Sequence, residues 1–265
     1  NPINHSLSPN LHNYWLKKYK INAVYEKQRL DSNELKDLTK KIKEKKLDGI
    51  NVTVPFKKEI IDFLDDLSPE AQKTESVNTI FLKGHKIFGH NTDINGFELA
   101  LRNINFEIKN KKVFIIGAGG VVSSIIFALK RMKASEIIIT NRTKKKAENL
   151  KTLFKEIKIF NWGKIPKFDV VINATSIGLK NDDVINLDFS KEENDKFYYD
   201  VIYNPKETNF LKKAKSLGNK AENGKKMFLY QAAEAFKIWH GIEPEINEDV
   251  MELLDKWKEL VFWEI

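Results

Sequence analysis

The stretch Val113-Phe-Ile-Ile-Gly117-Ala-Gly119-Gly120-Val-Val122 decides the fold. It begins as a run of β-branched and aromatic residues, which is typical of a buried strand, and its glycines then lead into a helix. At such a turn the backbone can approach a pyrophosphate, and the N–H groups of the helix can bind it. The usual third glycine of this fingerprint is replaced by Val122, and glycines alone also fit an ordinary tight turn.

At the end of the next expected strand the chain reads Asn141-Arg142-Thr143, with Lys146 one turn further on. Folds that bind NAD usually place an acidic residue here, which binds the ribose 2′-hydroxyl and would repel a 2′-phosphate. An amide beside two cations suits a 2′-phosphate, so the sequence predicts NADP as the cofactor. The alternative is that Arg142 and Lys146 only face solvent.

Strands and helices alternate regularly around this turn, and a later helix is expected to be capped by Thr208 and closed by Gly218. Such alternation predicts a parallel, doubly wound sheet of the Rossmann type. The expected strands are 112–116, 136–140, 157–160, 170–174 and 198–202, with one helix ending near 132 and a Lys-rich helix after 143.

The chain before residue 105 predicts a second α/β layer. Ser8 is expected to cap a helix whose first residue is Pro9, and a hairpin is expected to turn at Gly84. The chain closes with two expected helices, 226–239 and 248–257. The remaining expected elements are strands at 23–25, 49–54, 77–82 and 86–88, and helices at 31–46, 56–64 and 91–103.

The composition narrows the class of protein. Of the 265 residues, 42% are hydrophobic and 31% are charged, which is the balance of a soluble globular protein. The absence of cysteine excludes disulfides, a thiol nucleophile and thiolate metal sites. No apolar run approaches the roughly 20 residues of a membrane span and no signal peptide is visible, so we expect a cytoplasmic protein. The histidines show no metal-ligand spacing with carboxylates, so no metal is expected.

The formal net charge of +8 has three interpretations. Scattered lysines fit solvated helix faces, a nucleic-acid-binding surface, or the attraction of anionic ligands such as nucleotide phosphates and carboxylates. The motifs favour a mixture of the first and the last. We therefore expect a small-molecule substrate, no nucleic-acid or membrane partner, and a monomer or homodimer.

Further motifs extend over nearly the whole chain. They are Asn1-Pro-Ile-Asn-His-Ser6-Leu-Ser8-Pro9, Asn51-Val-Thr53-Val-Pro55-Phe-Lys57, Val77-Asn78-Thr79, Gly89-His-Asn91-Thr-Asp93-Ile-Asn-Gly96, Gly117-Ala118-Gly119-Gly120, Asn141-Arg142-Thr143, Asn173-Ala-Thr175-Ser176-Ile-Gly178, Tyr199-Asp-Val-Ile-Tyr203-Asn-Pro205 and Met227-Phe-Leu-Tyr-Gln231-Ala232. Together these motifs resemble the shikimate dehydrogenase family, in family order. That family normally has a β-strand before the first motif; this chain starts at Asn1 instead, which we interpret as a truncated start.

The resemblance implies an NADP-dependent reduction of 3-dehydroshikimate to shikimate, a step of aromatic amino-acid biosynthesis, with Lys57 and Asp93 as the catalytic pair. Ketone reduction needs a hydride donor and a proton donor for the developing alkoxide. A lysine beside a carboxylate can relay that proton and stabilise the negative charge. Taken alone, Lys57 could be one more solvated cation, and Asp93 could serve the first turn of its helix.

The resemblance also implies the ligand contacts. Ser6 and Ser8 alternate along an extended segment, so both hydroxyls could donate to a substrate carboxylate. Some of the implied contacts also have an ordinary structural alternative: an N-cap role for Ser8, a turn or capping role for Thr53 and Asn78, and a helix-surface position for Gln231. Tyr203 is implied at the carboxylate, and Thr53, Asn78 and Gln231 at the ring hydroxyls. The cofactor contacts implied or expected are Gly117, Ala118, Gly119, Gly120, Asn141, Arg142, Thr143, Lys146, Thr175, Ser176 and Gly224.

Two domains are expected, with the active site in the cleft between them. Residues 1–105 plus 226–265 would form the substrate-binding and catalytic domain, because the C-terminal helices carry Gln231. Residues 106–225 would form the NADP-binding domain.

Three other functions account for part of the sequence. A quinate/shikimate dehydrogenase with relaxed cofactor use stays open, although Arg142 and Lys146 argue against it. A glutamyl-tRNA reductase needs a cysteine nucleophile and is excluded. A non-catalytic binding protein on a Rossmann scaffold would explain the charge but not Lys57, Asp93 and the two serines together.

Overall fold

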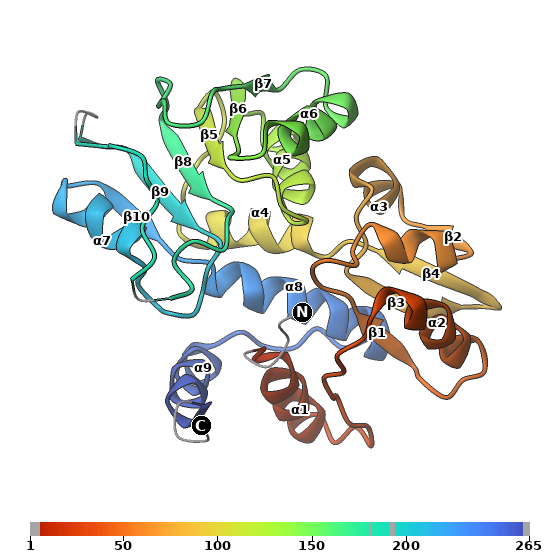
Figure 1. Cartoon of the computed structure of the whole chain (residues 1–265). Helices are drawn as coiled ribbons and strands as arrows, with labels where there is room; N and C mark the ends of the chain where they lie inside the picture. Colours follow the sequence, from red (N-terminus) through yellow and green to blue (C-terminus); the bar gives the residue numbers. More distant parts are fainter. Residues whose placement is uncertain (1–5, 181, 191–193, 262–265) are drawn as a thin grey trace. The chain divides into compact units, whose positions relative to one another are not determined.

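The computed structural model describes residues 6–180, 182–190 and 194–261, which form two compact units (Figure 1). One unit combines the chain up to Thr92 with the chain from Leu229 onward, and the other comprises Asp93–Phe228. The first five residues of the N-terminal motif, 1–5, lie outside the described residues. No described helix is long and apolar enough to cross a membrane.

A six-stranded sheet organises the second unit, and all of its neighbouring strands are parallel. Its order is β10-β9-β8-β5-β6-β7, so the chain builds outward from β5 in one direction and then from β8 in the other. This is the doubly wound Rossmann order, and the prediction of that fold is confirmed. The strands are β5 (Lys112–Ile116), β6 (Glu136–Thr140), β7 (Lys158–Ile159), β8 (Val170–Asn173), β9 (Phe197–Asp200) and β10 (Lys220–Glu222). The helices are α4 (Asp93–Asn103), α5 (Val122–Arg131), α6 (Lys144–Leu153) and α7 (Asn209–Ser216).

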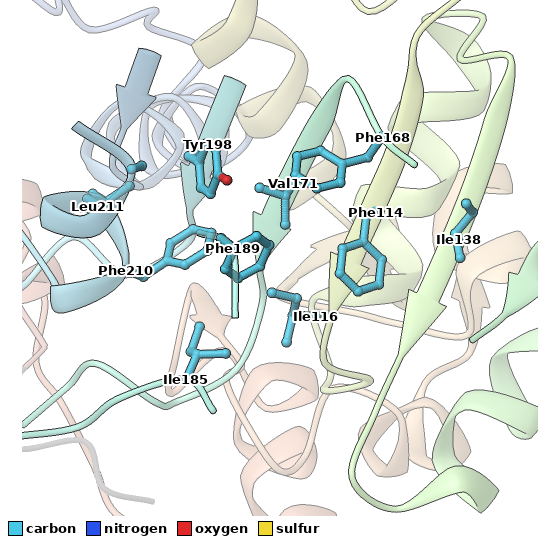
Figure 2. Packing of buried hydrophobic residues seen from close by; sticks show 11 residues of the cluster. Phe114, Ile116, Ile138, Phe168, Val171, Ile185, Phe189, Tyr198, Phe210 and Leu211 are labelled. Atoms are coloured by element: carbon cyan, nitrogen blue, oxygen red, sulfur yellow. The ribbon is translucent and has the colours of Figure 1, made fainter. Parts of the chain in front are cut away.

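Both faces of this sheet are covered, which explains its nearly continuous apolar strands. Phe114 and Ile116 of β5 point to one face together with Tyr198 of β9 (Figure 2). That face is closed by α7 and by Ile185 and Phe189, two side chains of the irregular segment between β8 and β9. The described residues between β8 and β9 form no helix, and these two side chains cover the face instead.

Helix α4 belongs to the second unit by its packing. Arg131 of α5 places its Nε 3.0 Å from Glu98 Oε1 of α4, and Glu98 is 4% exposed. Phe97 meets Tyr199 of β9 edge to face, with ring centroids 5.3 Å apart. The compact units consequently divide at 92/93 and 228/229, whereas the sequence places the functional boundaries near 105 and 225.

The first unit contains a four-stranded sheet of order β1-β3-β4-β2. Its centre is the predicted hairpin, which turns at Gly84 with a φ of +63°. The strands are β1 (Gly49–Asn51), β2 (Asp66–Leu67), β3 (Thr79–Lys83) and β4 (Lys86–His90). The helices are α1 (Ser8–Lys18), α2 (Leu35–Lys43), α3 (Pro69–Thr74), α8 (Lys225–His240) and α9 (Glu248–Val261), with 3-10 helices η1 (Ser32–Glu34) and η2 (Glu59–Phe63). Helix α8 begins within the second unit and continues into the first.

The expected elements of this unit that differ most from the structure are 23–25, 49–54 and 56–64. The segment 23–25 is not a strand, because the side chain of Asn13 takes the place of a partner strand: its Nδ2 donates to Tyr25 O and its Oδ1 accepts from Tyr25 N, both at 2.8 Å. Strand β1 ends at Asn51. The expected helix 56–64 is a series of turns followed by η2.

The expected cap of α1 is also wrong. The helix begins at Ser8 itself, Leu7 occupies the N-cap position, and no side chain caps it. The Ser8 N–H instead donates to Ser6 Oγ at 3.3 Å. The prediction for Thr208 is confirmed, since its hydroxyl accepts from Leu211 N at the start of α7. Gly218 closes that helix region with a φ of +77°.

Candidate active site

The glycine turn after β5 approaches the end of β8 closely. Gly117 has a φ of +115°, and a Cβ at this position would lie 2.7 Å from the carbonyl oxygen of Ala174. Its N–H donates to Thr140 O at the end of β6, at 2.8 Å. A side chain is therefore excluded at Gly117 both by space and by backbone conformation. This leaves bare backbone at the switch point of the sheet, where doubly wound folds bind a dinucleotide.

The segment after β6 is open and positively charged. Asn141 Nδ2 donates to Thr143 O at 2.8 Å, whereas Arg142, Thr143 and Lys146 are exposed. Thr143 is the N-cap residue of α6 but makes no side-chain cap, and the first turn contains no acidic residue. Cations at a helix N-terminus are unfavourable by themselves, because they meet the positive end of the helix dipole. A bound anion would interact favourably with both the cations and the uncapped N-terminus of α6, so these residues fit a 2′-phosphate.

A third turn, after β8, adjoins the glycine turn. The nearest side-chain atom to a Cβ built on Gly117 would be Thr175 Cγ2, at 3.0 Å. Thr175 is half-buried and its hydroxyl donates to Asn173 Oδ1 at 2.7 Å, while Ser176 is exposed. The structure thus brings the predicted residues Gly117 and Thr175 side by side.

The segment that follows β9 packs tightly on the residue that precedes α8. The Gly224 N–H donates to Ile202 O at 3.1 Å, and a Cβ on Gly224 would lie 2.1 Å from Val201 O. Half-buried Tyr203 stacks on Phe228, with ring centroids 4.5 Å apart and planes at 21°. Gly224 and Tyr203 therefore lie on two segments held together by their backbones.

Lys57 lies in the turn that follows β1 and is 8% exposed, unusual burial for a lysine. The turn contains a cis peptide bond between Val54 and Pro55, and Phe56 N donates to Thr53 O at 3.0 Å. The carbonyl of Lys57 accepts from Val77 N at 2.8 Å, one residue before Asn78. This pairing brings Lys57 and Asn78 onto adjacent segments.

Asn78 in turn connects to the residue before Asp93. Its Oδ1 accepts from Thr92 N at 2.8 Å and its Nδ2 donates to Thr92 Oγ1 at 2.9 Å. Asn78 is 3% exposed and Asp93, the first residue of α4, is 6% exposed. On α8, Glu234 Oε1 lies 3.3 Å from His90 Nε2 at the end of β4, which places Gln231 one helical turn away from that contact.

A cavity of about 610 Å³ lies within the first unit. Ser6, Ser8 and Thr53, all predicted as substrate contacts, line it, whereas Lys57 and Asn78 are not among its described lining residues. The structure thus groups the two serines with Thr53.

Sequence reasoning missed three residues that shape this cavity: His12, Tyr25 and Asn51. Tyr25 Oη donates to Asn51 Oδ1 at 2.8 Å, and the His12 ring stacks on Tyr25 at 4.3 Å. Burial lowers the pKa of His12 to about 3, so its ring is neutral at physiological pH. Asn51 stood in a recognised motif, but no pattern distinguished His12 or Tyr25 from ordinary core residues. Among the described residues, no group of three or more His, Asp or Glu could hold a metal ion.

Comparisons with known proteins cover both units. Residues 1–80 match the family described as the shikimate dehydrogenase substrate binding domain, and residues 98–208 match the shikimate / quinate 5-dehydrogenase family. Residues 226–252 match the shikimate 5′-dehydrogenase C-terminal domain. A curated relative from Pelagibacter ubique, named shikimate dehydrogenase (NADP(+)), is 58% identical over 96% of this chain and 96% of its own length.

Solved structures are similar over the same extent. The shikimate 5-dehydrogenase of Thermus thermophilus, in complex with NADP(H) and shikimate, superposes with a TM-score of 0.87 at 30% identity and covers 97% of both chains. The shikimate 5-dehydrogenase of Listeria monocytogenes, in complex with shikimate and NAD, has a TM-score of 0.88 at 31% identity and covers 96% of this chain and 93% of that one.

Proposed function

The chain belongs to the shikimate dehydrogenase family, and from that premise we propose how its own residues divide the work of the reaction. It is an NADP-dependent oxidoreductase that interconverts 3-dehydroshikimate and shikimate. When bound, NADPH supplies the hydride that reduces the ring ketone. The chain must supply a proton, hold the substrate and hold the nucleotide.

Lys57 donates the proton, and Asp93 positions its ammonium group. The burial of Lys57 carries this assignment, because a lysine that is 8% exposed needs a reason that packing alone does not give. A proton held on Nζ can pass to the ketone oxygen as negative charge develops there, which leaves a neutral amine; until that transfer, the positive charge of the ammonium group stabilises the oxygen.

The substrate contacts follow from donor chemistry. Ser6 and Ser8 hydroxyls, which line one cavity, donate to the substrate carboxylate, and Tyr203 joins them. Amides and hydroxyls both donate and accept, which suits neutral ring hydroxyls; Thr53, Asn78 and Gln231 take that role.

The nucleotide is held by backbone and by cations. Gly117, Ala118, Gly119 and Gly120 receive the pyrophosphate, since the space beside Gly117 admits no side chain. The remaining proposed contacts to the nucleotide are made by Thr175, Ser176 and Gly224. Asn141, Arg142, Thr143 and Lys146 bind the 2′-phosphate.

This division of work corresponds to a substrate-binding domain of residues 1–105 plus 226–265 and an NADP-binding domain of residues 106–225. We place the protein in the cytoplasm, as a monomer or homodimer without nucleic-acid partners.

We expect Arg142→Ala to weaken NADP binding by about 10–100-fold and to leave NAD binding unchanged, because one charge-assisted contact to the 2′-phosphate contributes about 1.5–3 kcal/mol. Titration of the free enzyme with each nucleotide measures both affinities. Lys151→Ala is the matched control, since it also removes one positive charge, but from the last turn of α6, whereas Arg142 precedes the first turn of that helix. Equal losses for NADP and NAD would contradict the assignment.

The substrate is tested by measuring spectrophotometrically the NADPH or NADH formed from shikimate or quinate, each with NADP or NAD. We expect the highest kcat/KM for shikimate with NADP. A kcat/KM for quinate equal to that for shikimate would instead identify the enzyme as a quinate/shikimate dehydrogenase.

A further inference from the structure

Asp200, the last residue of β9, is a fully buried carboxylate to which the reaction described above gives no role. Its Oδ1 accepts from Asn173 Nδ2 and from Ile202 N, both at 3.0 Å, and its Oδ2 accepts from Thr208 Oγ1 at 2.6 Å. All three partners donate. This is the pattern that an ionised carboxylate requires, because it can only accept hydrogen bonds.

The carboxylate sets the direction of a chain of hydrogen bonds. Because Asn173 Nδ2 donates to Asp200 and to Ile177 O at 3.1 Å, the amide oxygen of Asn173 must face the other way. There it accepts from the N–H of Thr175 at 3.1 Å and from its hydroxyl at 2.7 Å. The Thr175 oxygen then accepts from Ile177 N at 3.1 Å, which closes the turn.

This turn is the one that adjoins the glycines. A Cβ built on Gly117 would lie 2.7 Å from the carbonyl oxygen of Ala174 and 3.0 Å from Thr175 Cγ2. A second branch starts at Ile202, whose N–H donates to Asp200 and whose carbonyl accepts from Gly224 N at 3.1 Å. One side chain thus orders two segments at the carboxyl ends of β8 and β9, where the fold binds its nucleotide.

Burial disfavours the charge that makes this arrangement possible. It raises the pKa of Asp200 to about 6, even though three donors oppose the shift. A carboxyl group with a raised pKa in the folded state lowers stability above that pKa, and this loss is absent below its unfolded value. At neutral pH the ionised side chain therefore lowers the free energy of unfolding. An asparagine of the same shape has no charge, so it would avoid this desolvation cost.

We propose that Asp200 is a positioning residue for the cofactor: it holds the turn 174–178 and the segment 202–203 in the conformation that receives NADP. The proposal rests on the nucleotide site described under the proposed function. It predicts that removing the charge while keeping the shape damages cofactor binding without damaging the fold.

The test is Asp200→Asn, with NADP affinity of the free enzyme, KM and kcat, and the melting temperature at pH 8 measured on the same preparation. We expect NADP affinity to fall and the KM for NADP to rise by about tenfold, the effect of losing one charge-assisted bond. We expect kcat at saturating NADP to change less than the KM, and the melting temperature to stay the same or rise. NADP affinity within twofold of wild type, or a loss of affinity that comes with a lower melting temperature, would overturn the proposal.

Thr208→Val is the matched control, because it removes the bond to Oδ2 and the cap of α7 but leaves the two bonds to Oδ1. It should lower the melting temperature by about 2–4 °C and leave NADP affinity unchanged. A fall in NADP affinity in this variant as large as that in Asp200→Asn would contradict the route through Asn173.

If Arg142→Ala weakens NADP binding and Asp200→Asn does not, only the inference about Asp200 fails. If neither variant weakens NADP binding, the nucleotide site itself is wrong.

Discussion

Replacing Lys57 by alanine should lower kcat by about 10²–10⁴-fold, the usual contribution of general acid–base catalysis. If the ammonium interacts mainly with the developing alkoxide, the loss appears in turnover and far less in shikimate binding. Steady-state kinetics with NADP and shikimate measure both quantities. Lys58→Ala is a suitable control, since this neighbouring lysine is exposed and pairs with Glu75 on the surface.

Asp93→Asn should also reduce kcat severely, because it removes the charge that positions the ammonium. In the double variant the two losses should not add, since the residues act as one unit. Turnover of Lys57→Ala within a few-fold of wild type would show that another group, or water, delivers the proton. Additive losses would show that Asp93 acts independently of Lys57.

Replacing Gly224 by alanine should be the most damaging change to the fold of the nucleotide-binding unit. Its Cβ would lie 2.1 Å from Val201 O and 2.6 Å from Val201 C, which are backbone atoms at the end of the parallel sheet. Relieving that overlap requires the backbone to move, at a cost of about 3 kcal/mol or more. We expect the melting temperature to fall by about 6–12 °C. NADP affinity should fall with it, because Gly224 and Asp200 both hydrogen-bond to the backbone of Ile202.

Gly119→Ala provides the comparison, because its Cβ would meet only Ala174 O, at 3.8 Å. That is ordinary van der Waals contact, so we expect its melting temperature to stay close to that of wild type. A wild-type melting temperature for Gly224→Ala would show that the backbone of Val201 can move away from Gly224 at little cost.

The elements that could be predicted from the sequence are those whose own residues carry the signal. Strands β5 and β6 match their expected ranges, because each is an unbroken apolar run that must be buried on both faces. Strand β10, with the sequence Lys-Ala-Glu, has no such pattern and forms because β9 offers it a partner. The segment 23–25 is the reverse case. Its residues favour an extended backbone, but the Asn13 side chain, not a neighbouring strand, forms the backbone hydrogen bonds of Tyr25.

The same distinction holds for the site. Gly117 was predictable because its conformation is a property of the turn in which it lies. The role of Asp200 was not, because the motif Tyr199–Pro205 that contains it does not show which groups its side chain contacts. Its partners, Asn173 and Thr208, belong to separate elements that only the folded sheet brings together.

The first unit is interrupted in sequence by the whole of the second, and this sets an order of synthesis. On the ribosome, residues 93–228 are complete while the first unit still lacks most of α8 and all of α9. Until then Trp15 has no Phe236 to pack against, a ring contact of 5.5 Å in the finished protein, and Gly49 lacks the Trp239 ring beside it. Since nascent domains fold as units when their chain is available, the Rossmann unit should fold first. The nascent substrate-binding unit meanwhile exposes aromatic surface that a chaperone can recognise.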